Sequence, residues 1–191
     1  MIAGALTKDI GVMASDSSIY DSSKGVTIFE SPKLAITSGK TIISFVGSHL
    51  FFSNIDSGKF SMPFDSQCLY LADYLAKTKD AVTKLLNKED SEFSLHIMGL
   101  HKGFPKVAKL NSKKNFEPVY QWSENGLEFY GGDKEYMDKK VKKVKRDLSP
   151  GILGEILTRG IYRSVEVGGV VNVAYIGKDG NPIALSGVTN G

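Results

Sequence analysis

The sequence predicts an α+β fold in which antiparallel sheets carry helices on their outer faces. Short apolar runs separated by turn-forming residues fill the first part of the 191-residue chain and recur later. Apolar positions three and four residues apart mark separate helical stretches between these groups of strands. Grouped strands are typical of antiparallel sheets, whereas parallel sheets alternate single strands with helices. The length suits a single domain over residues 1–191.

The composition is that of a soluble globular domain. Apolar residues make up 41% and charged residues 24%, and the net charge of +3 is too small to predict a nucleic-acid partner. No apolar run approaches the roughly 18 residues of a membrane-spanning helix. No basic and apolar leader opens the chain, so we expect a cytoplasmic protein with no membrane partner.

The first strands are expected over residues 2–6 and 10–15. The turn-like Thr7-Lys8-Asp9 between them predicts a hairpin. Further strands are expected at 26–30, 33–37 and 41–46.

A long amphipathic helix is expected from residue 65 to residue 87, with Asp65 as its cap. Its apolar stripe consists of Cys68, Leu71, Ala72, Leu75, Val82, Leu85 and Leu86. The single cysteine excludes an intramolecular disulfide, and its apolar neighbours predict a buried structural thiol.

The second half repeats the order of strands, helices and strands. Strands are expected at 93–100, 106–110 and 119–122, and a last hairpin at 170–176 and 183–185. One helix is expected over 134–146, and another after the cap Ser149 with Pro150 in its first turn. Gly154 and Gly160 are costly inside a helix, so they predict close packing against a neighbour.

The basic stretch 139–146 has two interpretations. It suits a solvated helix face, and it also suits a patch for RNA or an acidic partner. The stretch lacks the interleaved aromatic residues of RNA-binding modules, so we favour the helix face and expect no nucleic-acid partner.

Several familiar sites are absent from the sequence. His49, His96 and His101 lack metal-ligand spacing, and no phosphate-binding glycine loop or GxSxG motif occurs. We therefore expect no metal and no cofactor, and we interpret the histidines as structural or surface residues.

Asp16, Lys33 and Gly47 remain as candidate site residues, because each lies at an end of an apolar strand. A carboxylate in that position is costly unless something pairs with it. A lysine beside a carboxylate can tune the proton affinity of a nucleophile, and a glycine N–H can stabilise an oxyanion. The alternative is a plain ion pair at a sheet edge, which the spacing alone favours.

Four stretches, in order, resemble the proteasome β subunits and their bacterial relatives, which are N-terminal nucleophile (Ntn) hydrolases. The stretches are TKDIGVMASDSS, SPKLAI, TIISFVGS and VGGVVNVAYIGKDG. The resemblance reaches both ends of the chain and implies a four-layer αββα sandwich of two antiparallel sheets flanked by helices. It also implies a homo-oligomer, with a ring as one arrangement, and a peptide or protein substrate. It leaves any ATPase partner open.

The same resemblance implies roles for single residues. Asp16 and Lys33 would tune the nucleophile, and the Gly47 N–H would bind the oxyanion. The nucleophile position falls at or one residue before Met1, where a thioether stands in place of a threonine hydroxyl. The family's late aspartate corresponds to Ser164, with Glu166 as a displaced substitute.

Two other departures concern loops. FYGGD stands where the family has a serine-containing turn, and the segment after Gly47 is too short for the family's first long helix. The hypothesis is a proteasome-like subunit of the threonine-peptidase lineage without its nucleophile, so activity on amide bonds stays open. The alternatives are a non-catalytic self-assembling or peptide-binding homologue, and an amidohydrolase or acyl-transfer enzyme of the same fold.

Overall fold

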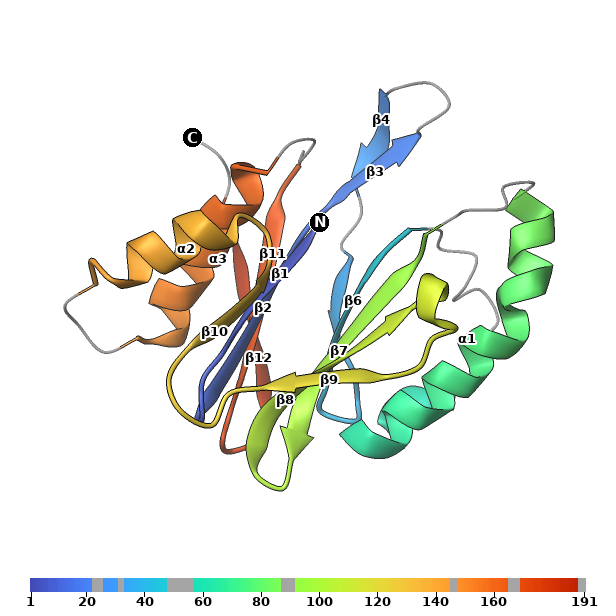
Figure 1. The fold of residues 1–191 in the computed structure, drawn as a ribbon, viewed down its shortest axis with the longest axis horizontal. Helices are drawn as coiled ribbons and strands as arrows, with labels where there is room; N and C mark the ends of the chain where they lie inside the picture. The colour runs from blue at the N-terminus through green and yellow to red at the C-terminus, as the bar shows by residue number, and fades with distance from the viewer. Residues whose placement is uncertain are drawn as a thin grey trace.

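The computed structural model describes residues 1–21, 26–30, 33–47, 57–86, 92–144, 148–164 and 169–188. Over these ranges the chain forms two five-stranded antiparallel sheets, a two-stranded ribbon and three α-helices (Figure 1). The predicted α+β class and the antiparallel sheets are confirmed.

The first sheet has the strand order β10-β1-β2-β11-β12. Its strands are β1 (Ile2–Leu6), β2 (Ile10–Asp16), β10 (Glu128–Gly131), β11 (Val171–Gly177) and β12 (Pro182–Val188). Every residue of β1 is buried, because this strand lies inside the sheet and both of its faces are covered.

The second sheet has the order β5-β6-β7-β8-β9. Its strands are β5 (Leu34–Ile36), β6 (Ile42–Val46), β7 (Ser94–His101), β8 (Phe104–Asn111) and β9 (Val119–Trp122). Two further strands, β3 (Ser18–Asp21) and β4 (Val26–Glu30), pair with each other and extend beyond the sheets (Figure 1). The sequence did not predict β3.

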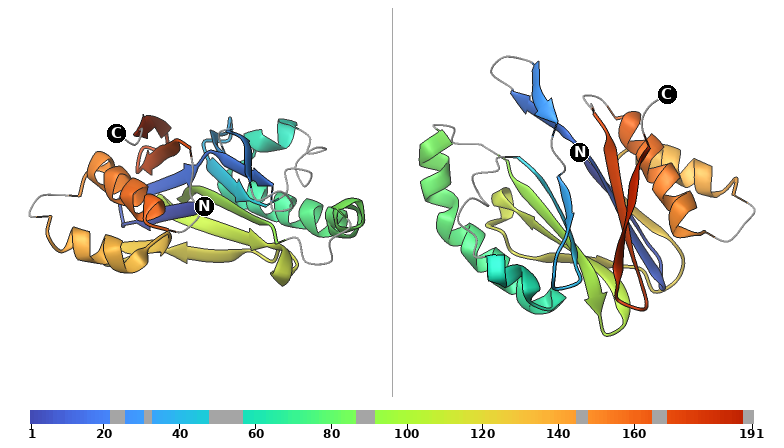
Figure 2. Two further views of the ribbon diagram at one scale, coloured as in Figure 1. Left: turned by 90° about the horizontal axis from the view of Figure 1, so that it is seen from above. Right: turned by 180° about the vertical axis from the view of Figure 1, so that it is seen from behind.

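The helices cover the outer faces of the sheets. The long helix α1 (Phe64–Leu86) lies on the second sheet, and α2 (Lys134–Val141) and α3 (Pro150–Tyr162) lie on the first (Figure 2). The layers therefore follow the order helix, sheet, sheet, helices. Short 3₁₀ turns precede α1 at Ser57–Ser61 and follow β8 at Ser112–Lys114. No helix in the described ranges combines the length and the apolar composition needed to cross a bilayer.

Three buried clusters of apolar side chains fill the spaces between these layers. One packs α2 and α3 on the first sheet, a second packs α1 on the second sheet, and a third lies between the sheets. The third contains Ile2, Leu6, Met13, Ile42, Met98, Val107, Tyr130, Ala174 and Ile176.

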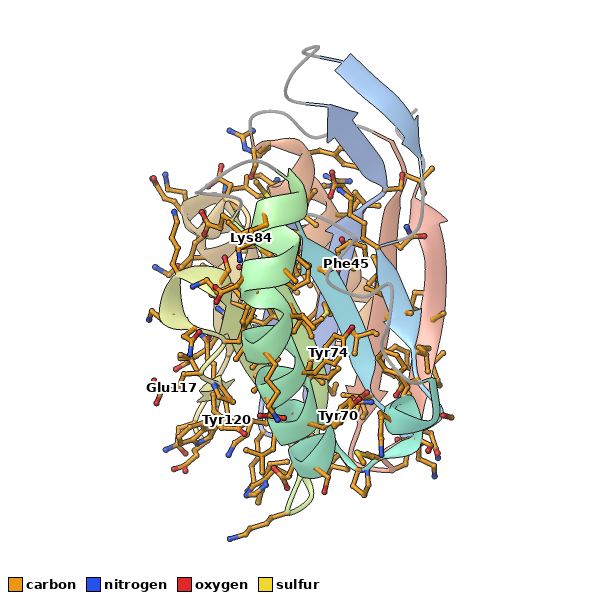
Figure 3. All side chains as sticks on the ribbon, turned by 90° about the vertical axis from the view of Figure 1, so that its right-hand side faces the viewer. Phe45, Tyr70, Tyr74, Lys84, Glu117 and Tyr120 are labelled. Carbon is orange, nitrogen blue, oxygen red and sulfur yellow. The ribbon has the colours of Figure 1, made fainter. Side chains whose placement is uncertain are left out.

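The stripe predicted for α1 faces the second sheet. Cys68, Leu71, Leu75 and Val82 are buried there, whereas the side chains of residues 85 and 86 lie outside the described ones. Burial raises the pKa of the Cys68 thiol to about 12, with a further contribution from Asp65, so this thiol stays protonated. Figure 3 looks onto α1, with Tyr70 and Tyr74 on one side of the helix and Tyr120 on the other.

Helix ends follow the predicted caps in α3 but not in α1. Ser149 accepts a hydrogen bond from the Ile152 N–H at 3.4 Å, with Pro150 in the first turn. The predicted cap Asp65 is instead a first-turn residue of α1, and its carboxylate lies 2.8 Å from His101. The helix predicted over 134–146 ends at Val141, and Lys142 and Lys143 after it are exposed. Like charges on neighbouring turns disfavour a longer helix.

The predicted turn at FYGGD is wrong in position. Residues Glu128–Gly131 form β10, which pairs with β1, and Tyr130 lies opposite Gly4. A Cβ atom at Gly4 would lie 2.0 Å from the Tyr130 ring, so glycine is required for this strand pair to close. The chain turns only after the strand, where Gly131 and Gly132 both have positive φ.

Candidate functional site

The candidate site lies where β1 begins and β2 ends. The antiparallel register pairs Ile2 with Ser15, which places Asp16 beside Met1. The Asp16 N–H donates to the Met1 carbonyl at 3.3 Å, and the Ser15 hydroxyl donates to the same oxygen at 3.2 Å. The hairpin thus brings the start of the chain to the aspartate through backbone pairing alone.

A single carboxylate oxygen holds two cations. Asp16 Oδ1 accepts a hydrogen bond from the N-terminal ammonium of Met1, and it lies 3.0 Å from Lys33 Nζ. The Asp16 side chain is only 4% exposed and the Lys33 side chain 10%, so water screens neither charge well. We call Met1, Asp16 and Lys33 the N-terminal cluster.

The N-terminal cluster joins the two sheets. Met1 directly precedes β1 and Asp16 ends β2 of the first sheet, whereas Lys33 precedes β5 of the second. Figure 1 places the N-terminus at the upper end of the sandwich, between the two sheets. The cluster therefore lies where the sheets meet and not on an outer, helix-covered face.

Burial biases the N-terminal amine toward its neutral form. Burial lowers the pKa of the Met1 α-amine below its usual value, and the hydrogen bond to Asp16 offsets this only in part. The Lys33 ammonium lowers the same pKa further. More of the amine is therefore free base near neutral pH than at an exposed N-terminus, which suits a general base.

Two serines beside Asp16 belong to this region, and the sequence reasoning assigned neither of them. Ser15 holds the Met1 carbonyl, and the Ser17 hydroxyl accepts a hydrogen bond from the Val170 N–H at 2.9 Å. Ser17 thereby fixes the start of β11 next to Asp16. The sequence pattern that could have identified them is a serine on each side of the aspartate, at the end of an otherwise apolar strand.

The two other described candidates follow different elements, β6 and α3. Gly47 follows β6 with a φ of 108°, and a Cβ atom there would lie 2.4 Å from the Glu92 carbonyl. Ser164 follows α3, where its hydroxyl donates to the Gly160 carbonyl at 3.1 Å. Glu166 lies outside the described residues. Of the predicted residues, the structure brings Met1, Asp16 and Lys33 into contact, and the roles assigned to all six stay predictions.

The cluster supplies cations and a base but no side-chain nucleophile. The Met1 thioether has no proton to lose, and the nearest threonine in sequence, Thr7, lies at the far end of β1, about 20 Å away at strand spacing. The Thr7 hydroxyl accepts a hydrogen bond from the Ile10 N–H at 2.9 Å and so stabilises the turn. Within the described ranges, no three His, Cys, Asp or Glu side chains gather in a way that could hold a metal ion.

Comparison with known proteins gives a likeness of fold. Anbu from Hyphomicrobium sp. strain MC1, a proteasome-like protein, superposes with a TM-score of 0.65. The alignment covers 97% of this chain and 88% of that chain, and the sequence identity is 13%. No family model matches the sequence, and no curated protein matches it either.

These findings correct the family assignment made from sequence motifs. The identification as a proteasome β-subunit-like member of the Ntn hydrolase superfamily is wrong as a family assignment, because no family model or curated relative supports it. At 13% identity, the likeness to Anbu concerns the fold alone.

Proposed function

We propose that this protein is a self-assembling subunit of a proteasome-related lineage. In it, Asp16 anchors the Met1 ammonium, and the N-terminal cluster does not cleave amide bonds. The observation that carries the proposal is the shared oxygen of Asp16, which binds the Met1 ammonium and Lys33 together. The likeness of fold to Anbu supports the lineage.

The chemistry of residue 1 is the reason for excluding hydrolysis from the proposal. Attack on an amide carbonyl needs a hydroxyl, thiol or amine that can lose a proton and form a bond to carbon. The side chain of Met1 offers none of these, whereas Asp16 and Lys33 can still position and polarise a hydroxyl placed there. In a chain that keeps Met1, the cluster is therefore a structural anchor.

A second candidate, amide hydrolysis, is favoured by one observation, which is the lowered pKa of the α-amine. An amine that is partly free base could take a proton from a hydroxyl on residue 1. In this candidate, the Gly47 N–H would bind the oxyanion, and Ser164 and Glu166 would support the cluster. It requires a mature N-terminal residue other than methionine.

The test separates these two functions. We expect intact mass to show Met1 retained, and an N-terminal-threonine inhibitor to leave the native protein unlabelled. Expression of the Met1→Thr variant behind an initiator methionine yields a free threonine, because the initiator is excised before small residues. We expect this variant to hydrolyse short fluorogenic peptides slowly and to be labelled by the inhibitor.

The control removes the lysine from the activated variant. Lys33→Ala combined with Met1→Thr should abolish the hydrolysis gained by the threonine, while the fold measured by circular dichroism persists. Labelling or peptide hydrolysis by native protein that retains Met1 would overturn the proposal, because it would reveal a nucleophile that residue 1 does not provide.

A further inference from the structure

A groove lies at the end of the sandwich opposite the N-terminal cluster. It has a volume of ≈ 490 Å³ and is formed by the β1–β2 turn, the β7–β8 hairpin and the segment that follows β9. Figure 1 shows the β7–β8 turn at the lower end of the molecule, away from the N-terminus. We call this the end groove, and five of its residues carry the argument: Lys8, Lys102, Phe104, Lys106 and Trp122.

The end groove carries an excess of positive charge, because three lysines line it against one carboxylate, Glu124. Among the described residues, no carboxylate lies within ion-pair distance of the ammonium groups of Lys8, Lys102 and Lys106, whereas His101 is paired with Asp65. Lys102 also has a φ of 51°, a conformation that favours glycine or asparagine.

The same groove presents two aromatic rings to solvent. Trp122 is 45% exposed and Phe104 is 46% exposed, although large apolar side chains are usually buried. The register pairs Lys106 with Trp122, and Lys106 Nζ lies 4.6 Å from the indole centroid. The indole N–H donates to Glu124 at 3.2 Å, which fixes the orientation of the ring.

We propose that the end groove binds a small anion with a planar aromatic ring, of the nucleoside-monophosphate class. The ring would stack on Trp122 or Phe104, and the phosphate would lie among the ammonium groups of Lys8 and Lys102. Aromatic side chains stack on any nucleobase, and lysines bind phosphate as point charges. The groove falls within the roughly 300–1,000 Å³ of small-molecule sites. This proposal does not depend on the function proposed above.

The experiment uses the full chain and its own fluorescence. Trp122 is the only tryptophan in the protein, so quenching on titration reports this groove alone. We expect saturable quenching by AMP, and binding at least about tenfold weaker for adenosine, which lacks the charge, and for ribose 5-phosphate, which lacks the ring. Lys102→Gln and Lys8→Gln should each weaken AMP binding about fivefold, the effect of one nearby exposed charge.

The matched control is Lys77→Gln, which lowers the net charge equally on the exposed face of α1, where Lys77 pairs with Asp73. We expect this variant to bind AMP as the native protein does. Three outcomes would overturn the proposal. They are the absence of saturable quenching at millimolar AMP, equal weakening by Lys77→Gln and Lys102→Gln, and binding of a short oligoadenylate about a hundredfold tighter than AMP, which would identify a strand-binding groove.

Discussion

Asp16 is the residue on which the charges at the N-terminus depend. Its carboxylate is almost fully buried and is shared by the Met1 ammonium and Lys33. Removing the carboxylate leaves two cations close together and poorly hydrated, whereas removing Lys33 leaves one intact ion pair. Loss of Asp16 should therefore lower the stability of the fold more than loss of Lys33 does, although the two residues form a single contact.

Asp16→Asn should cost about 3–5 kcal/mol of unfolding free energy, the loss typical of a buried pair deprived of one partner. Lys33→Met should cost clearly less, because the Met1–Asp16 pair persists and the methionine retains much of the apolar contact of the lysine stem. Chemical denaturation measures both values. The exposed carboxylate Asp73, changed to asparagine, should alter stability by less than about 1 kcal/mol. A larger loss for Lys33→Met than for Asp16→Asn would contradict this account.

A second group of polar residues is buried between the sheets. Ser44 pairs with His96 across β6 and β7, and His96 pairs with Lys109 across β7 and β8. Within the described residues, Ser44 Oγ, His96 Nδ1 and the Tyr130 hydroxyl have no hydrogen-bond partner. The Tyr130 ring lies 5.6 Å from the His96 ring, and Lys109 Nζ lies 4.4 Å from the Tyr130 centroid.

This environment keeps His96 neutral. Burial, with a smaller contribution from Lys109, lowers the pKa of His96 to about 3 from an ordinary value of 6.5. Between these values the unfolded chain binds a proton that the folded chain does not. The His96 contribution to stability is therefore complete above about pH 6.5 and is lost as the pH falls toward 3.

Replacing His96 with leucine should remove this acid sensitivity. Each pH unit below 6.5 costs the native protein about 1.4 kcal/mol through His96, so its stability should fall more steeply than that of His96→Leu between pH 6 and 4. Urea unfolding at several pH values provides the measurement. Parallel curves for native protein and His96→Leu would contradict this account.

At the scale of elements, α1 and α3 cover opposite faces of the sandwich. Gly154 and Gly160 of α3 allow the close approach that the sequence predicted. A Cβ atom at Gly154 would lie 3.1 Å from Val173 of β11, and one at Gly160 would lie 2.8 Å from Met137 of α2. Both α1 and α3 bury apolar side chains against a sheet, so their stability depends on packing more than on intrinsic helix propensity.

Truncating one buried residue in each helix should therefore destabilise the protein. Leu75→Ala in α1 and Ile156→Ala in α3 should each lower the unfolding free energy by about 2–5 kcal/mol, through lost burial and the cavity left behind. Leu69 of α1 is 63% exposed, so Leu69→Ala should change stability by less than about 0.5 kcal/mol. Thermal or urea unfolding measures these changes in unfolding free energy. Changes near zero at both buried positions would mean that the apolar stripes face solvent.

At the scale of the whole molecule, the self-assembling subunit that we propose must form an oligomer. A head-to-tail contact between identical subunits closes into a ring when its rotation closes. Light scattering should therefore give a mass several times the 20.8 kDa of one chain. A mass of one chain throughout the micromolar range would contradict the self-assembling subunit that we propose.

The sequence by itself determined part of the local structure. Periodicity placed α1 within a residue of its observed start and end, and it placed the β1–β2 hairpin and the cap of α3. Each of these depends on neighbours a few residues away, whose spacing is visible in the chain. The sequence also drew attention to Asp16 and Lys33, because a charge at the end of an apolar strand requires a partner.

Only the tertiary structure decided the contacts between distant segments. FYGGD has the composition of a turn, yet most of it is a strand, because β1 provides an edge and Gly4 leaves room for the Tyr130 ring. The polar layer around His96 likewise depends on the register of three strands and on a tyrosine from the other sheet. Such pairings depend on which backbone groups remain available after the sheets assemble. A local sequence pattern does not show which strand a segment will pair with.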